Sequence, residues 1–219
     1  MRYCYLFTLC LPLLIGCGTS QNTDAIAVAT EPAIPYDSLK AVLTEVLQTD
    51  QGVREKFTST STQEEQLALM EEMHKVDSAN QVTVVSILEK YGWLPKSKLG
   101  EEAASSLFYV VQHSNLPTME KYLPLLQQKA QEGEASKVHA AMMEDRVLMW
   151  QGKKQIYGTQ ATTMGREDGK MAIWPIEDPE NVNKRRQEAG FPTTVEANSE
   201  RLGAIYNPKA ELPIEGQEG

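Results

Sequence analysis

The chain has 219 residues, of which 41% are hydrophobic, and it carries a formal net charge of −9 at pH 7. This acidic balance excludes the basic stripe that follows nucleic acid phosphates, so we expect no nucleic acid partner. All three cysteines, Cys4, Cys10 and Cys17, lie near the amino terminus, which excludes disulfide scaffolds, zinc ribbons and cysteine nucleophiles from the rest of the chain.

The amino terminus has the pattern of an export signal. Arg2 supplies a positive charge, and an apolar run of 11 residues follows over 5–15, whereas a helix needs about 20 such residues to cross a bilayer core. Gly16 and Cys17, preceded by aliphatic residues, resemble the lipobox of bacterial lipoproteins. We therefore predict that residues 1–16 are a signal peptide and that Cys17 carries the lipid, including palmitate. The alternative is an ordinary signal peptide with an incidental cysteine.

Residues 17–35 are rich in Thr, Ala, Ser and Asn, and this composition predicts a lipid-anchored flexible tether. Loss of Arg2 leaves 20 basic residues against 30 acidic ones, a net charge of −10. The membrane is thus a partner through acyl chains rather than through attraction to anionic lipid. We expect a membrane-anchored protein of the cell envelope, on the outer membrane in a Gram-negative host, because Gly18 rather than aspartate follows the cysteine.

Helical periodicity dominates residues 36–206, which we predict to form one domain. Apolar residues recur three and four positions apart after six expected helix starts, namely Ser38, Thr62, Asp77, Gly100, Pro117 and Ser136. Capping residues mark two further helix starts, at Asp178 before a proline and at Thr193 with Glu196 three positions on. Residues 155–163 and 171–175 flank a turn-like segment and predict a β-hairpin. The fold class is therefore mainly α, with six to eight helices and one small C-terminal β-hairpin, followed by a disordered tail over 207–219.

Asp145 is the most informative anomaly, because it lies in the middle of the apolar face of a predicted helix. A carboxylate in that place must be paired or hydrogen-bonded. Arg146 points about 100° away around the helix, so the partner should come from another element. His113 is one candidate, and the hydroxyl groups of Tyr157 and Thr159 are others. Asp145 is then either a structural acid that ties the helix to the hairpin or a catalytic or ligand-binding group.

The sequence predicts no metal site and no cofactor. The three histidines, His74, His113 and His139, do not have the spacing of metal ligands. We expect His74 and His139 at the surface or at its boundary. A glycine elbow around a nucleophile and a phosphate-binding loop are also missing from the sequence.

Several of these residues belong to motifs that stand in a familiar order. The motifs are Gly92-Trp93, Gly100-Glu101, Gln112-His113, Asp145-Arg146, 155–160 and 176–192. Together they resemble a bacterial family catalogued as domain of unknown function 6624, over roughly residues 76–206, with residues 36–75 outside the pattern. The resemblance brings no known activity. Because many members lack a lipoprotein signal, it implies that the anchor is an addition to the domain.

The anomalies and the motifs together define a candidate polar pocket, formed by Gln112, His113, Asp145, Arg146, Tyr157, Thr159 and Gln160. Three hypotheses follow, and none of them assigns a catalytic residue with a known reaction. The favoured one is a binding module of the cell envelope, whose partner is an unknown small molecule or envelope protein. The second is an enzyme that uses His113 and Asp145 as an acid–base pair. The third is a purely structural polar network.

Overall fold

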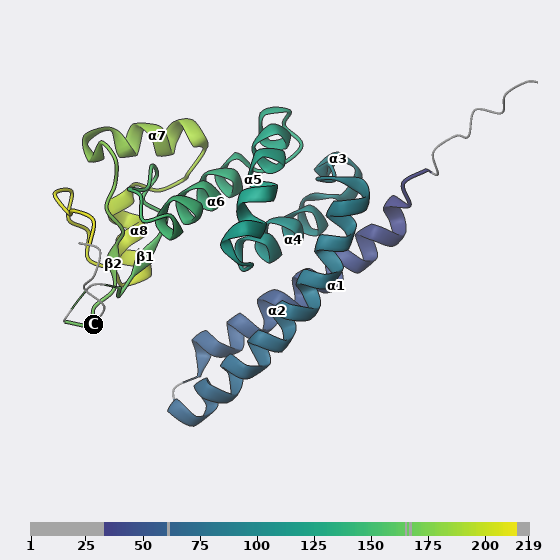
Figure 1. The fold of residues 1–219 in the computed structure, drawn as a ribbon, viewed down its shortest axis with the longest axis horizontal. Helices are drawn as coiled ribbons and strands as arrows, with labels where there is room; N and C mark the ends of the chain where they lie inside the picture. The colour runs from purple at the N-terminus through teal and green to yellow at the C-terminus, as the bar shows by residue number, and fades with distance from the viewer. Residues whose placement is uncertain (1–32, 61, 165, 167, 214–219) are drawn as a thin grey trace, which may run out of the picture. The chain divides into compact units, whose positions relative to one another are not determined.

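The computed structural model describes residues 33–60, 62–164, 166 and 168–213 (Figure 1). The predicted signal peptide, Cys17 and most of the predicted tether lie outside these residues. Within the described part of the chain, no helix is both long and apolar enough to cross a bilayer.

Eight α-helices and one two-stranded antiparallel sheet form the described chain, which confirms the predicted mainly α class with a small C-terminal hairpin. The helices are α1 (Tyr36–Ser59), α2 (Gln63–Tyr91), α3 (Lys96–Leu99), α4 (Glu101–Gln112), α5 (Leu116–Gln131), α6 (Lys137–Trp150), α7 (Val182–Ala189) and α8 (Val195–Leu202). The strands are β1 (Ala161–Thr162) and β2 (Ala172–Ile173), and a short 3-10 turn over Pro179–Asn181 precedes α7.

α1 and α2 run side by side as a long helical pair (Figure 1). Thr62 caps α2 as predicted, since its Oγ1 accepts from the Glu65 N–H at 3.4 Å and donates to the Glu65 carboxylate at 2.6 Å. The prediction of a separate helix start at Asp77 is wrong, because α2 continues through this residue. Asp77 instead accepts a hydrogen bond from Arg54 of α1 at 2.8 Å. Its charge therefore serves the contact between the two helices rather than a helix end.

The larger apolar core is built by α1 to α6 around α4. Leu107 and Val111 of α4 are fully buried, as are Leu43 of α1 and Met143 of α6. α4 packs against α1, α2, α3, α5 and α6. Its C-terminal end, where Gln112 and His113 lie, is therefore held from several sides by the core.

A second, smaller core lies under the C-terminal sheet. Ile173, Ile176, Val182 and Val195 are all buried there. The hairpin pairs Ala161 with Ile173 and Thr162 with Ala172, so it is shorter than predicted. The expectation of a strand over 155–160 is wrong, because this segment is a loop between α6 and β1.

The chain after α8 returns to the sheet. The Ile173 N–H donates to the Ile205 carbonyl and the Ile205 N–H donates to the Met171 carbonyl, each at 2.9 Å. Of the tail predicted over 207–219, the structure describes residues 207–213, in which Glu211 pairs with Lys154 at 2.9 Å. Residues 214–219 lie outside the described part of the chain.

Gly158 is the residue of the 155–160 loop that no other amino acid can replace without strain. Its φ is +68°, in the left-handed region that favours glycine. A Cβ at this position would lie 2.6 Å from Val195 Cγ2 and 2.8 Å from Ile176 Cδ1. The loop backbone therefore rests directly on the second core, with no room for a side chain.

We predict that Gly158→Ala lowers the free energy of unfolding by about 1–3 kcal/mol more than Gly152→Ala does. Gly152 is the matched control, because its φ is +69° but a Cβ there would meet nothing within 4 Å. Both variants carry the left-handed strain, and Gly158→Ala adds the steric conflict. Urea unfolding of both variants measures the difference, and equal losses would mean that the loop does not rest on this core.

Candidate functional site

Asp145 is fully buried, and its carboxylate is surrounded by hydrogen-bond donors of the 155–160 loop. Oδ1 accepts from the N–H groups of Ile156 and Tyr157, at 2.7 and 3.0 Å. Oδ2 accepts from the N–H and the hydroxyl of Thr159, at 3.0 and 2.9 Å. The Thr159 hydroxyl is thus one of the partners anticipated from the sequence, whereas Tyr157 contributes its backbone.

The protonation of Asp145 follows from this surrounding. Burial raises the pKa of the carboxyl, and the backbone hydrogen bonds from Tyr157, Thr159 and Ile156 oppose that rise. A proton on either oxygen would face another donor, so the geometry favours the ionised form. Because both oxygens are engaged inside the protein, the arrangement gives Asp145 a structural role.

The carbonyl groups of the same loop accept hydrogen bonds from the two last helices. The donors are Arg185 to Ile156, Arg186 to Tyr157 and Asn198 to Gly158, at 3.0, 2.8 and 3.0 Å. Gln155 and Gln160 close the loop, since the Gln160 N–H donates to Gln155 Oε1 at 2.8 Å and Gln155 Nε2 donates to the Gln160 carbonyl at 3.0 Å. The loop is therefore fixed on both sides.

His113 does not pair with Asp145, which corrects the acid–base pair suggested by the sequence. Its Nδ1 lies 3.4 Å from Oδ1 of Asp50, a residue of α1 whose side chain is 1% exposed. Asp145 is instead saturated by the loop, so it has no oxygen left for a histidine. The carboxylate beside His113 is one that the sequence reasoning did not single out.

Asp50 carries the same signal that identified Asp145. The buried residues of α1 are Leu39, Leu43, Val46, Asp50 and Val53, an apolar stripe interrupted by one acid. The stripe begins with Leu39, Leu43 and Val46, in the first half of α1. Extending it by one more turn predicts a buried carboxylate at position 50.

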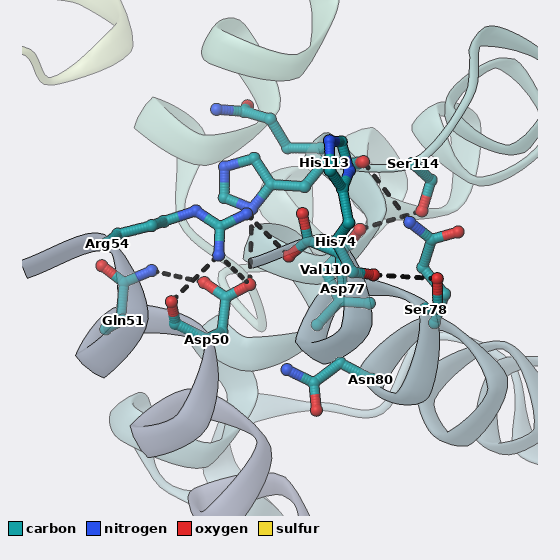
Figure 2. Close-up of polar contacts among 12 residues, drawn as sticks. Asp50, Gln51, Arg54, His74, Asp77, Ser78, Asn80, Val110, His113 and Ser114 are labelled. Atoms are coloured by element: carbon teal, nitrogen blue, oxygen red, sulfur yellow. Dashed lines mark hydrogen bonds and ion pairs between the residues drawn. The ribbon is translucent and has the colours of Figure 1, made fainter. Parts of the chain in front are cut away.

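Arg54 joins the two acids near His113, and Figure 2 shows its side chain reaching both. Nη1 donates to Asp50 Oδ1 at 3.0 Å and Nη2 donates to Asp77 Oδ1 at 2.8 Å. Burial alone raises the pKa of Asp50, but the hydrogen bond with His113 and the charges of His113 and Arg54 hold that pKa below its usual value.

Asp50, Asp77 and His113 bring together the types of side chain that hold a cation. One ligand atom each from Asp50, Asp77 and His113 lies within 4.8 Å of the others, a spacing that suits a metal ion. However, the Arg54 guanidinium donates to both carboxylates and already supplies the positive charge between them. We therefore describe the group as an ion-pair network.

Arg146 connects this network to the 155–160 loop. Its Nε donates to Gln160 Oε1 at 3.1 Å, and its Nη1 donates to the Gln112 carbonyl at 3.3 Å. Burial lowers the pKa of the guanidinium, and the positive charge of Arg54 lowers it further. Among the described residues, no carboxylate lies within 4.0 Å of Arg146. We use the name junction site for Arg54, Gln112, His113 and Arg146.

The other two histidines lie outside the junction site. His74 is exposed on α2, as expected. His139 is partly buried, and its ring stacks on Phe108 with centroids 4.0 Å apart and planes inclined by 6°. Burial lowers the pKa of His139 to about 4, so its ring is neutral at neutral pH. Of the three histidines, His113 is the one whose ring lies beside Asp50.

The seven residues of the predicted pocket therefore divide into two groups. Asp145, Tyr157 and Thr159 form the internal loop anchor. Gln112, His113 and Arg146 form part of the junction site, and Gln160 touches both groups. A model of a family described as a family of unknown function (DUF6624) matches residues 37–209.

The chain belongs to the DUF6624 family. The expectation that the family pattern begins near residue 76 is wrong, because the DUF6624 match starts at residue 37 and includes both Asp50 and Arg54. The junction site and the loop anchor thus lie wholly within the DUF6624 region. No curated protein and no solved structure matches the chain.

We predict that Asp145→Asn lowers the free energy of unfolding by about 3–5 kcal/mol or prevents cooperative folding. The new amide would place N–H groups against loop donors that point at the same atoms. The control is Glu144→Gln, on a partly buried neighbour, for which we expect a change below about 1 kcal/mol. Denaturant unfolding followed by circular dichroism measures both. An Asp145→Asn protein with unchanged stability would contradict the structural role.

Proposed function

We propose that the protein is a lipoprotein of the cell envelope whose helical domain binds a small anionic ligand at the junction site. The first part rests on the signal pattern before Cys17. The second rests on a single observation, the partly buried Arg146 guanidinium that has no counter-ion among the described residues. The anchor would hold this binding domain at a membrane surface, the outer membrane in a Gram-negative host.

The case for a ligand at Arg146 comes from its unused donors. Nε and Nη1 each donate once, to neutral oxygens, and Nη2 has no acceptor among the described residues. A charge taken out of water without a counter-ion is costly. An anion that accepts from the free N–H groups would remove this cost. Guanidinium groups are also the preferred partners of carboxylate and phosphate oxygens.

Arg186 provides the internal comparison. It is 2% exposed, and each of its three nitrogens has an acceptor: the Thr193 carbonyl, the Tyr157 carbonyl and the Thr193 hydroxyl, at 2.8, 2.8 and 3.2 Å. Its guanidinium also lies 4.4 Å from the centre of the Phe191 ring. In this structural arginine, every guanidinium nitrogen is therefore hydrogen-bonded within the protein. Arg146 differs, because its Nη2 has no acceptor among the described residues, and this difference supports a binding role for it.

The surroundings of Arg146 suit an anion for a second reason. Arg54 is close enough to lower the pKa of Arg146 by repulsion, and an anion near both groups would relieve that repulsion. The side chains of Arg54 and His113 are 21% and 20% exposed, respectively. This side of the junction site is therefore in contact with solvent.

The lipid anchor is tested by labelling cells that express the full chain with a radioactive fatty acid. We expect the wild-type chain to be labelled and the Cys17→Ser chain to remain unlabelled as an uncleaved precursor. Cys10→Ser is the matched control, because Cys10 also lies in the predicted signal, and it should leave labelling unchanged. Labelling of the Cys17→Ser chain would contradict the proposed anchor.

The binding site is tested with the full chain purified in detergent and titrated calorimetrically with acetate, citrate and inorganic phosphate. We expect at least one anion to bind, and Arg146→Gln to weaken that binding by about tenfold to a hundredfold, because a charge-assisted hydrogen bond is lost. The empty Arg146→Gln protein should lose about 1–3 kcal/mol of stability, because Gln160 Oε1 and the Gln112 carbonyl each lose a donor.

The control for this titration is Arg201→Gln. Arg201 is exposed and donates to Asn198 at 2.9 Å, so its loss changes the net charge equally without touching the junction site. Wild-type affinity is expected. The absence of binding by every anion would contradict the proposed function. Conversion of the bound anion to a product would instead favour an acid–base enzyme that uses His113 and Asp50.

A further inference from the structure

Gln112 contains a buried acceptor that the fold leaves unused. The residue is 5% exposed, and its Oε1 is fully buried with no hydrogen-bond partner among the described residues. Buried polar atoms in native proteins nearly always have a partner. Gln155 and Gln160, which are similarly buried, both use their amide groups fully in the loop. The unpaired Oε1 of Gln112 therefore requires an explanation.

The position of Gln112 links this acceptor to the proposed anion site. Its own carbonyl accepts from Arg146 Nη1 at 3.3 Å, and the next residue, His113, lies beside Asp50. The unused donors of Arg146 and the unused acceptor of Gln112 thus belong to two residues that are joined through the Gln112 backbone carbonyl. A ligand that satisfies both must present charged oxygens and a hydrogen-bond donor within one small group.

We propose that this group is a phosphoryl oxyanion that retains a proton, as in inorganic phosphate or a phosphate monoester. Its ionised oxygens accept from Arg146, and its P–OH donates to Gln112 Oε1. Acetate and sulfate carry the negative charge at neutral pH but have no proton to donate. The tetrahedral centre places the hydroxyl directly beside the ionised oxygens, which matches donors and an acceptor on adjoining residues. This inference rests on the proposed function and specifies its ligand.

Charge supports the same class of ligand. Arg54 carries one positive charge against the two negative charges of Asp50 and Asp77, whereas Arg146 has no carboxylate within 4.0 Å among the described residues. The two acids are both bound to Arg54, which leaves Arg146 as the group that faces an incoming anion. A partly protonated phosphoryl group brings less negative charge toward Asp50 and Asp77 than a fully ionised one does.

The test compares inorganic phosphate with sulfate at pH 7 and equal ionic strength, by calorimetric titration of the full chain in detergent. We expect phosphate to bind at least about tenfold more tightly, because a site with a buried acceptor rejects an analogue that lacks the donor. Glycerol 3-phosphate, titrated in the same way, shows whether the site accepts a monoester. Glycolate, a carboxylate with a hydroxyl donor, is the competing ligand.

The variant for this test is Gln112→Met, which removes the acceptor at nearly constant length. We expect phosphate affinity to fall to the level of sulfate, and sulfate affinity to stay unchanged. Gln128→Met is the control, because Gln128 is exposed on α5 and its amide donates to the Glu132 carboxylate at 2.8 Å. This variant should keep the phosphate preference. The comparison in the wild-type chain needs no variant, so poor folding of Gln112→Met would leave the inference testable.

The outcomes separate this inference from the proposed function. If phosphate and sulfate bind equally to the wild-type chain, or glycolate binds more tightly than phosphate, the phosphoryl assignment is overturned while an anion site at Arg146 stands. If no anion binds, both proposals fail. A phosphate preference that survives in Gln112→Met would show that Gln112 Oε1 does not accept a hydrogen bond from the P–OH, and would overturn its role in the inference.

Discussion

The carboxylate of Asp145 is the group on which the C-terminal half of this fold depends. It accepts hydrogen bonds from the N–H groups of Ile156, Tyr157 and Thr159. These residues lie in a loop, where no helix or sheet supplies acceptors for their N–H groups. The loop in turn lies against Val195 and Ile176 of the second core. One side chain of α6 thus ties the larger core to the smaller one, and its charge is tolerated because both of its oxygens accept hydrogen bonds from the loop.

The same loop positions the junction site. Gln160 ends the loop, and its Oε1 accepts from Arg146 while its Nε2 donates to the Met142 carbonyl of α6. Asp145 and Arg146 are adjacent in sequence but point about 100° apart around the helix. One therefore faces the loop interior and the other faces α4. The dipeptide places a structural charge and a proposed ligand-binding charge on the two sides of a single helix.

The electrostatics of the junction site are local. The chain has a net charge of −9, which repels anions at long range, but this field is screened beyond about 10 Å at 0.1 M salt. Within the site, Arg54 is compensated by Asp50 and Asp77, whereas Arg146 is not. The difference between these two arginines, rather than the overall charge, decides where an anion would bind.

The sequence by itself determined the helical class, the capping of α2 by Thr62 and the need for Asp145 to find a partner. These follow from local rules, namely apolar periodicity, side-chain capping and the cost of burying a charge. The sequence also contained the signal for Asp50, an acid within an apolar stripe. Only the tertiary structure decided which donor meets which acid. Asp50 and His113 are 63 residues apart, and Asp145 takes its donors from a loop whose conformation depends on contacts with α7 and α8. Partners of this kind are set by the packing of distant elements, and no spacing within the chain records that packing.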